Sequence, residues 1–266
     1  MIVKLAQKDY IRIENFFNEN TYQIPALAVL NGKFPGRVFV DNNEKPEIAL
    51  VWAISRWAYI SCKELLPRHK SFITEVFNSE ILPVLKMLRE QRFEVYADND
   101  SRWDCILNEA LNEYKLDRHY ENTFVLNKEK FLEFTSNLKV PQDIEICEIN
   151  FPIIPDEFSK YVEKDWSNKA VFGMMLKKNK NIISQCINNG FIYNNYYFID
   201  LDTFNLTERN NGYGTLISYK LICKELSKGL SPLWETTTNN LSSQRVANKL
   251  GFEKVCEYPV YSISGY

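Results

Sequence analysis

The segment Arg209-Asn210-Asn211-Gly212-Tyr213-Gly214-Thr215 lies between a predicted strand and a predicted helix. The aromatic and apolar run at 196–201, which precedes it, is typical of a strand. After it, apolar residues recur at spacings of three and four, which is one face of a helix: Leu216, Tyr219, Cys223 and Leu226. Two glycines are therefore placed at a strand-to-helix turn.

Such a turn favours an anion. The first turn of a helix has backbone N–H groups without helical partners, and the helix dipole attracts negative charge there. Glycine allows positive φ and removes the Cβ that would keep a phosphate away, and Arg209 adds a permanent cation. The sequence lacks the Lys-Ser/Thr of a P-loop after the second glycine, and it lacks G-x-G-x-x-G. We therefore predict a phosphate or pyrophosphate cradle at 209–215, with a glycine-rich turn without a ligand as the alternative.

The pattern R-x-x-G-x-G-T resembles the acetyl-CoA loop of the GNAT acyltransferase superfamily. Downstream, a predicted strand at 231–236 carries P-x-W-E, and a short predicted helix carries N-x-x-S-x-x-x-A-x-K-L-G-F from Asn240 to Phe252. Together these strings are similar to the branch that includes zwittermicin-resistance-type acetyltransferases, a bacterial type. The resemblance covers residues 141–266.

The resemblance implies the cofactor, the reaction and part of the site. Acetyl-CoA would bind the cradle, and an acetyl group would pass to an amine of a small molecule, such as an antibiotic-like aminopolyol, by direct attack on the thioester. In this family a backbone N–H of the central strand polarises the thioester carbonyl, which places that group near Leu201 or Thr203. Asn240 would contact the pantetheine arm or position the adjacent loop, and Ser243 lies one turn further on.

The acid and the base each have alternative candidates. Many family members carry a tyrosine four residues before the Gly-Phe glycine, and this chain has Ala247 there. Either Ser243 replaces the tyrosine, or water protonates the thiolate. For the base, Asp200 and Asp202 are two residues apart on one strand and so face the same side. Glu235 on the neighbouring strand is the rival, and each of these carboxylates could instead be solvated. The missing tyrosine also favours an alternative function, a catalytically silent GNAT-fold module that binds CoA or a partner.

Composition limits the classes of protein. The chain has 266 residues, a net charge of −2 and 45% apolar residues, with a mean hydropathy of −0.32. We expect no nucleic-acid partner, no membrane association and no metal, since the sequence has no basic stripe, no long apolar run and no Cys-x-x-Cys. With no export signal we expect a cytoplasmic protein. The sequence is compatible with a homodimer but does not decide the oligomeric state.

We predict two domains, an N-terminal α+β domain at 1–140 and the GNAT domain at 141–266, which meet at a polar, proline-containing segment. The predicted fold is α+β, with a mixed, mostly antiparallel twisted sheet flanked by helices. From residue 37 on, the first half repeats the second half's element order, but it has no glycine between Gly36 and Gly173. We therefore interpret it as a degenerate GNAT-like half that shapes the acceptor pocket or an interface. The alternative is an unrelated α+β cap. Other expectations are a helix at 71–91 broken or kinked by Pro83, a helix at 155–166, and tail strands at 254–258 and 260–263.

Overall fold

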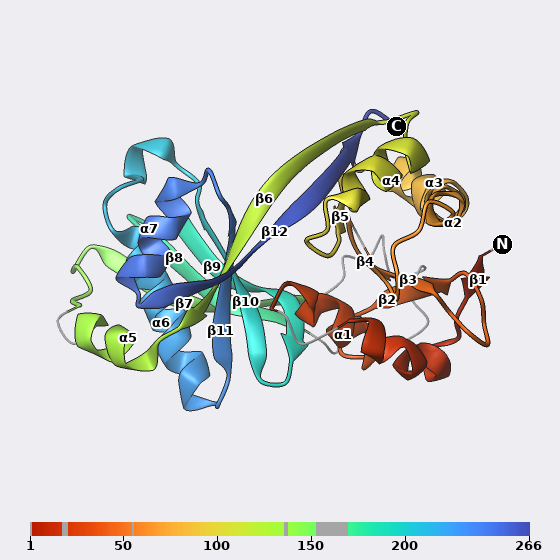
Figure 1. The fold of residues 1–266 in the computed structure, drawn as a ribbon. Helices are drawn as coiled ribbons and strands as arrows, with labels where there is room; N and C mark the ends of the chain where they lie inside the picture. Colours follow the sequence, from red (N-terminus) through yellow and green to blue (C-terminus); the bar gives the residue numbers. More distant parts are fainter. Residues whose placement is uncertain (1, 18–20, 55, 136–137, 153–169) are drawn as a thin grey trace. The chain divides into compact units, whose positions relative to one another are not determined.

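The chain forms two compact units. A computed structural model describes residues 2–17, 21–54, 56–135, 138–152 and 170–266 (Figure 1). The first unit comprises residues 2–121 and Glu257–Tyr266, and the second comprises residues 122–152 and 170–256. The division therefore falls at Glu121, earlier than the predicted boundary near residue 140, and the chain's last ten residues group with the first unit.

The second unit has a mixed sheet. Four strands form an antiparallel meander: β7 (Ile144–Pro152), β8 (Ala170–Lys178), β9 (Asn181–Tyr193) and β10 (Tyr196–Thr203). Helix α6 (Tyr213–Ser227) then leads to β11 (Ser231–Thr237), which pairs with β10 in parallel. The ends of two long strands complete the sheet beside β11: β6 (Lys115–Leu126) and, after α7 (Leu241–Lys249), β12 (Phe252–Ser264). This is the predicted α+β arrangement of the GNAT fold.

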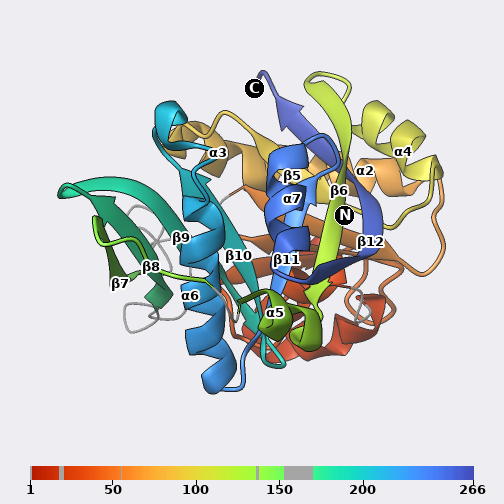
Figure 2. The same cartoon turned by 90° about the vertical axis from the view of Figure 1, so that its left-hand side faces the viewer.

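Three helices cover one face of this sheet (Figure 2). Residues of α6, α7 and α5 (Lys128–Thr135) share one apolar core with β8, β9, β10 and β11. Trp234 of β11, at 2% exposure, and Tyr197 of β10, at 0%, are its largest members. Burial of this face fixes where α6 begins, because Leu216 and Ile217 of its first turns are part of the core.

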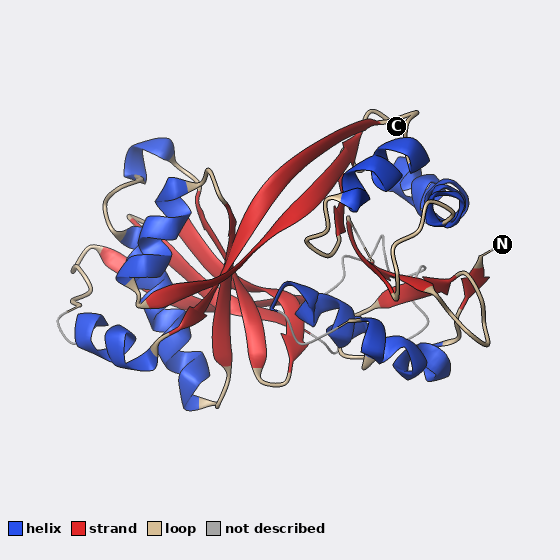
Figure 3. Ribbon diagram, in the orientation of Figure 1, coloured by secondary structure: helices blue, strands red, loops and turns tan. Residues whose placement is uncertain are grey.

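The first unit begins with β1 (Val3–Lys4), the 3₁₀ helices Gln7–Phe16 and Thr21–Gln23, and α1 (Ile24–Leu30). Its central strands are β2 (Gly36–Val40), β3 (Ile48–Ala53) and β4 (Trp57–Cys62). Then come α2 (His69–Val76), a π-helical turn (Phe77–Ile81), α3 (Leu82–Leu88), β5 (Phe93–Tyr96) and α4 (Arg102–Ala110). Helices α2 and α4 pack side by side, whereas α1 packs on β3 (Figure 3).

The two units repeat the same strand pairings. In the first, β2, β3 and β4 are successively antiparallel, and β5 returns to pair with β4 in parallel after α2 and α3. In the second, β8, β9, β10 and β11 have the same relations, with α6 as the connection. The echo in the sequence is thus an echo in pairing, as expected if the first half is GNAT-like.

The outcome differs among three of the predicted elements. The helix expected at 71–91 is interrupted at Phe77–Ile81, and Pro83 lies in the first turn of the new helix α3, where its missing N–H costs no helical bond. The two expected tail strands were wrong: β12 runs unbroken through Pro259, because proline's φ fits extended backbone and only one donor is lost. The helix expected at 155–166 lies outside the described residues.

Candidate cofactor cradle and active site

The predicted turn joins β10 to α6 through a tightly folded loop. Asn205 caps the 3₁₀ turn Leu206–Glu208, since its Oδ1 accepts from the Thr207 N–H at 3.0 Å. Beyond it, Asn210 and Gly212 have positive φ of 65° and 80°. Gly212 is therefore in the left-handed region that glycine tolerates best, and from there the chain enters α6.

The first turn of α6 presents donors outward. The Leu216 N–H donates to the Gly212 carbonyl at 3.0 Å, which makes this the first bond of the helical ladder. The N–H groups of Tyr213, Gly214 and Thr215 precede that bond, and no side chain caps the helix at Gly212. With the helix dipole added, this turn offers converging donors and a partial positive charge to an anion.

The two glycines have different roles. A Cβ built on Gly212 would meet nothing within 4 Å, so the position faces open space in front of the helix. A Cβ on Gly214 would lie 3.2 Å from Leu201 Cδ2, so glycine lets the first turn of α6 approach β10 closely. Both observations fit the diphosphate of a nucleotide-like cofactor: Gly212 leaves the space beside it clear, and Gly214 lets the helix lie close to the strand.

Arg209 is held at the edge of the turn. Its Nε donates to the Thr203 carbonyl at 3.1 Å, and its Nη2 lies 3.7 Å from Asp202 Oδ1. The guanidinium is thus attached to the end of β10, and half of the side chain stays exposed. This is the position that the sequence predicted for a cation beside the concavity.

A second cation at the turn was not predicted. Lys178, the last residue of β8, places its Nζ 3.1 Å from the Tyr213 hydroxyl and 3.4 Å from Glu208 Oε2, and 5.5 Å from the centre of the Tyr213 ring. These two contacts raise the pKa of Lys178. No local pattern could reveal it, because Lys178 comes from a strand that is two positions away in the sheet.

Strands β10 and β11 separate beside this turn. Their parallel pairing ends at Ile199 and Trp234, although β10 continues to Thr203 and β11 to Thr237. The Phe204 N–H donates to the Ile183 carbonyl of β9, so by alternation the N–H groups of Leu201 and Thr203 point away from β9. They therefore face the gap, where the family resemblance places the polarising N–H.

The candidate bases lie on the other face of β10. Leu201 packs towards α6, so Asp200 and Asp202 project from the opposite face, and both are exposed. Asp202 forms the ion pair with Arg209, which joins this carboxylate to the cradle. Glu235 of β11 is half-buried. The expected shared face of the two aspartates is present, but their role as a base stays a prediction.

The candidate residues of α7 have structural partners. Asn240 caps the helix, since its Oδ1 accepts from the Ser243 N–H at 3.1 Å. Ser243 Oγ in turn accepts from the Trp234 indole N–H at 2.8 Å. Ala247 is fully buried. Asn240 thus fixes the start of α7, and its role towards the pantetheine arm or the adjacent loop stays a prediction, while the Ser243 hydroxyl keeps its proton for another partner.

The matching turn of the first unit is closed. Between β4 and α2, Leu65 is buried and its carbonyl accepts from Arg102 Nη1 at 3.4 Å, while the Leu66 N–H donates to His69 Nδ1 at 3.4 Å. Where β4 and β5 end, the Asp98 carboxylate accepts from Tyr22, Gln23 and Ser61. The His69 and Lys70 N–H groups of the first turn of α2 also donate to the Leu66 and Pro67 carbonyls, at 3.0 and 3.3 Å, so these donors and the Leu66 N–H are already used.

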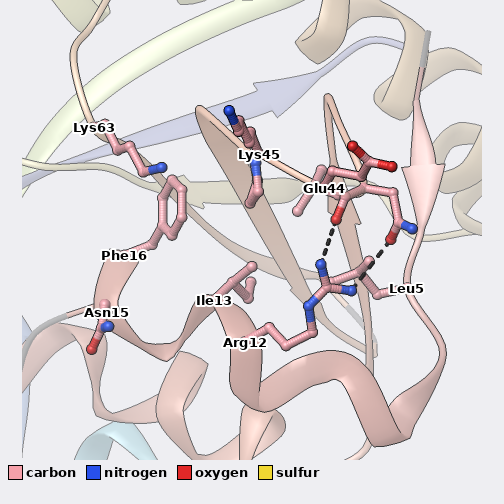
Figure 4. Close-up of a pocket in the computed structure, with 11 residues that line it drawn as sticks. Leu5, Arg12, Ile13, Asn15, Phe16, Glu44, Lys45 and Lys63 are labelled. Carbon is pink, nitrogen blue, oxygen red and sulfur yellow. Dashed lines mark hydrogen bonds between the residues drawn. The ribbon is translucent and has the colours of Figure 1, made fainter.

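One surface recess in the first unit, of ≈ 300 Å³, lies between the 3₁₀ helix Gln7–Phe16 and the turn after β2 (Figure 4). Arg12 donates from Nη2 to the Asn43 carbonyl at 2.5 Å, and Lys63 lies over the Phe16 ring. None of the predicted site residues lines it. Within the described ranges no cluster of potential metal ligands occurs, and no described helix is long and apolar enough to cross a membrane.

Comparisons with known proteins concern the fold and the family. An uncharacterized N-acetyltransferase of Bacillus subtilis, YdfB, is 22% identical over 270 residues, which is 98% of both chains. A GCN5-related N-acetyltransferase-like protein of Streptococcus suis has the same fold, with a TM-score of 0.64 at 16% identity over 97% of this chain and 100% of its own.

A tandem GNAT protein from the clavulanic acid biosynthesis pathway aligns with a TM-score of 0.60 at 10% identity, over 100% of this chain and 99% of its own. Its two-domain arrangement supports a similar one here. The family model described as GNAT acetyltransferase matches residues 14–261. Because that match spans nearly the whole chain, the protein belongs to the GNAT acetyltransferase family.

Proposed function

We propose that the protein is an acetyl-CoA-dependent N-acetyltransferase that acetylates an amine of a small molecule by direct attack on the thioester. The observation that carries the proposal is the turn before α6. There the three amide N–H groups at 213–215 precede the helical ladder, and Gly212 leaves the space in front of them open. A diphosphate is the group in acetyl-CoA that such a turn binds.

The reaction needs an acetyl donor, a group that polarises the thioester carbonyl, a base and an acid. Bound acetyl-CoA supplies an activated acetyl thioester. The N–H groups of Leu201 and Thr203, which face the gap between β10 and β11, are placed to donate to a carbonyl oxygen there. A C–N bond forms as the C–S bond breaks. The amine proton passes to a base, and the departing thiolate takes a proton from an acid or from water.

For the base we propose Asp200, Asp202 or Glu235. Asp202 is joined to the turn by its ion pair with Arg209, whose Nη2 lies 3.7 Å from Asp202 Oδ1. For the acid we propose Ser243 or water. Ser243 Oγ accepts a bond from Trp234, which leaves its own proton available for donation. A thiolate is a tolerable leaving group near pH 8, so water alone also permits turnover.

A second function is favoured by one observation. Ala247, which is fully buried, occupies the position where many family members have a tyrosine that can serve as the general acid. A silent module that binds CoA or a partner would need the cradle but no acid. The zwittermicin-resistance-type motifs favour the enzyme and an aminopolyol-like acceptor. For the first unit we propose the role of a degenerate GNAT-like half that shapes the acceptor pocket or an interface.

Two measurements test the proposal. Titration of coenzyme A into the protein should release or absorb heat, and a panel of amines with acetyl-CoA should yield free thiol for at least one acceptor. Binding without thiol release would support the silent module, and no binding would refute the cradle. If Asp200→Asn, Asp202→Asn and Glu235→Gln all keep the wild-type pH–rate profile, none of the three is the base.

A further inference from the structure

Lys178 is a cation at the turn before α6 that the family motifs do not account for. It precedes the two-residue turn Asn179-Lys180, whose φ values of 52° and 67° are those of a tight hairpin turn, and it pairs with Asn181 of β9. By alternation Lys178 shares a face with Leu176, which belongs to the core beneath α6. A rigid hairpin thus directs its ammonium to the start of that helix.

Its partner, Glu208, is an acidic residue within the turn that we propose binds an anion. Asn211 Nδ2 donates to the Glu208 carbonyl and to its Oε2, each at 3.3 Å. The carboxylate is therefore held within the loop that leads to Gly212. The side chains of Lys178 and Glu208 are only 27% and 21% exposed, so solvent screens this pair less than it screens a surface pair.

The same ammonium reaches the other end of the loop. Its contact with the Tyr213 hydroxyl links Lys178 to the first residue of α6, while its contact with Glu208 links it to the residue before Arg209. One cation therefore joins the two sides of the cradle. Without it, the Glu208 carboxylate would repel a bound diphosphate.

We propose that Lys178 is a positioning residue for the cofactor. It neutralises Glu208, so that the turn accepts a diphosphate. The inference rests on the proposed binding of acetyl-CoA at this turn. If Lys178 instead contacted a phosphate directly, it would be needed whether or not Glu208 were charged. In the role proposed here, Lys178 is needed only while Glu208 carries its charge.

That difference defines the test, which measures the Kd of coenzyme A by calorimetry. Lys178→Met should raise this Kd by about five-fold, and adding Glu208→Gln to the same chain should return it to within about two-fold of the wild type. Lys180→Met removes an equal charge from the exposed hairpin turn and should leave the Kd unchanged. At saturating acetyl-CoA, kcat of Lys178→Met should equal the wild-type kcat, as a loss of cofactor positioning alone requires.

The possible results of these titrations distinguish the positioning role of Lys178 from its alternatives. If Lys178→Met binds like the wild type, or if the double variant binds as weakly as Lys178→Met, the positioning role is refuted. Equal weakening by Lys180→Met would reduce the effect to overall charge and would also refute it. If the wild-type protein does not bind coenzyme A, the proposed function fails, and this inference fails with it.

Discussion

Replacement of Gly212 by alanine tests the cradle directly. Gly212 has φ 80° and ψ 3°, and a Cβ there would point into open space. The substitution therefore has two separable effects: strain in the backbone, and a methyl group where we place the diphosphate. The chain offers a matched control in Gly229, just beyond the other end of α6, which has φ 83° and also has nothing within 4 Å of a built Cβ.

The expected magnitudes differ between stability and binding. A non-glycine residue in the left-handed region costs about 1–2 kcal/mol, so both variants should lose about that much free energy of unfolding. In a chain of this size that corresponds to a fall in Tm of about 2–4 °C per kcal/mol. A hydrogen bond to a charged group contributes about 1.5–3 kcal/mol, so loss of one such bond from amide to phosphate should raise the Kd of coenzyme A about ten- to hundred-fold.

The assay is calorimetric titration of coenzyme A into the two variants at a temperature where both are folded, with thermal unfolding measured in parallel. We expect similar falls in Tm and a weaker Kd for Gly212→Ala alone. Equal Kd values, within two-fold, for Gly212→Ala and Gly229→Ala would refute the reasoning, because the open space before α6 would then not be where the diphosphate binds.

Three further predictions concern side chains. Burial raises the pKa of Asp98, so the folded state favours its protonated form; the stability that Asp98 contributes should be lost as pH rises from about 4, so the wild type should lose stability relative to Asp98→Asn over that range in denaturant titrations at several pH values. Ser243→Ala should lower the free energy of unfolding by about 1–2 kcal/mol, because the Trp234 indole N–H loses its acceptor; unchanged stability would contradict that bond. If Asp202 is the base, Asp202→Asn should lower kcat about 100-fold or more and remove the acidic limb of the pH–rate profile, whereas Asp200→Asn should leave both unchanged.

Most of the fold was predictable because its signals are local. The apolar runs of β3 and β10, the 3–4 spacing of α6 and the glycine that ends α7 each reflect one element's own burial or termination. Strand ends were less predictable. Strand β9 extends to Tyr193, past Gly190, and β12 continues through Pro259, because pairing with neighbours outweighs local preference there.

The residues of the candidate site likewise fall into those predictable from local sequence and those that depend on long-range contacts. The glycine turn, Arg209 and the two aspartates lie close together in the sequence, so their spacing was enough to place them. Lys178 and the bond from Trp234 to Ser243 depend on which strands and helices lie next to each other, and a single sequence does not carry that information. The division of the chain at Glu121 likewise follows from long-range pairing, whereas the prediction relied on a polar segment.

The repeated pairing makes both units candidates for an anion-binding turn, and we propose such a turn in the second unit alone. Both units turn from a central strand into a helix beside a parallel neighbour, so topology alone would provide two anion sites. In the second unit the turn contains glycines and its first-turn amides have no cap. In the first, α2 also has no side-chain cap, but the His69 and Lys70 N–H groups of its first turn donate to the Leu66 and Pro67 carbonyls at 3.0 and 3.3 Å, and Leu65 is buried in the turn. Glycine alone would therefore not open this turn, because those carbonyls would still accept from the donors. Pairing thus sets where such a turn can form, and the conformation of the turn decides whether its amides are available.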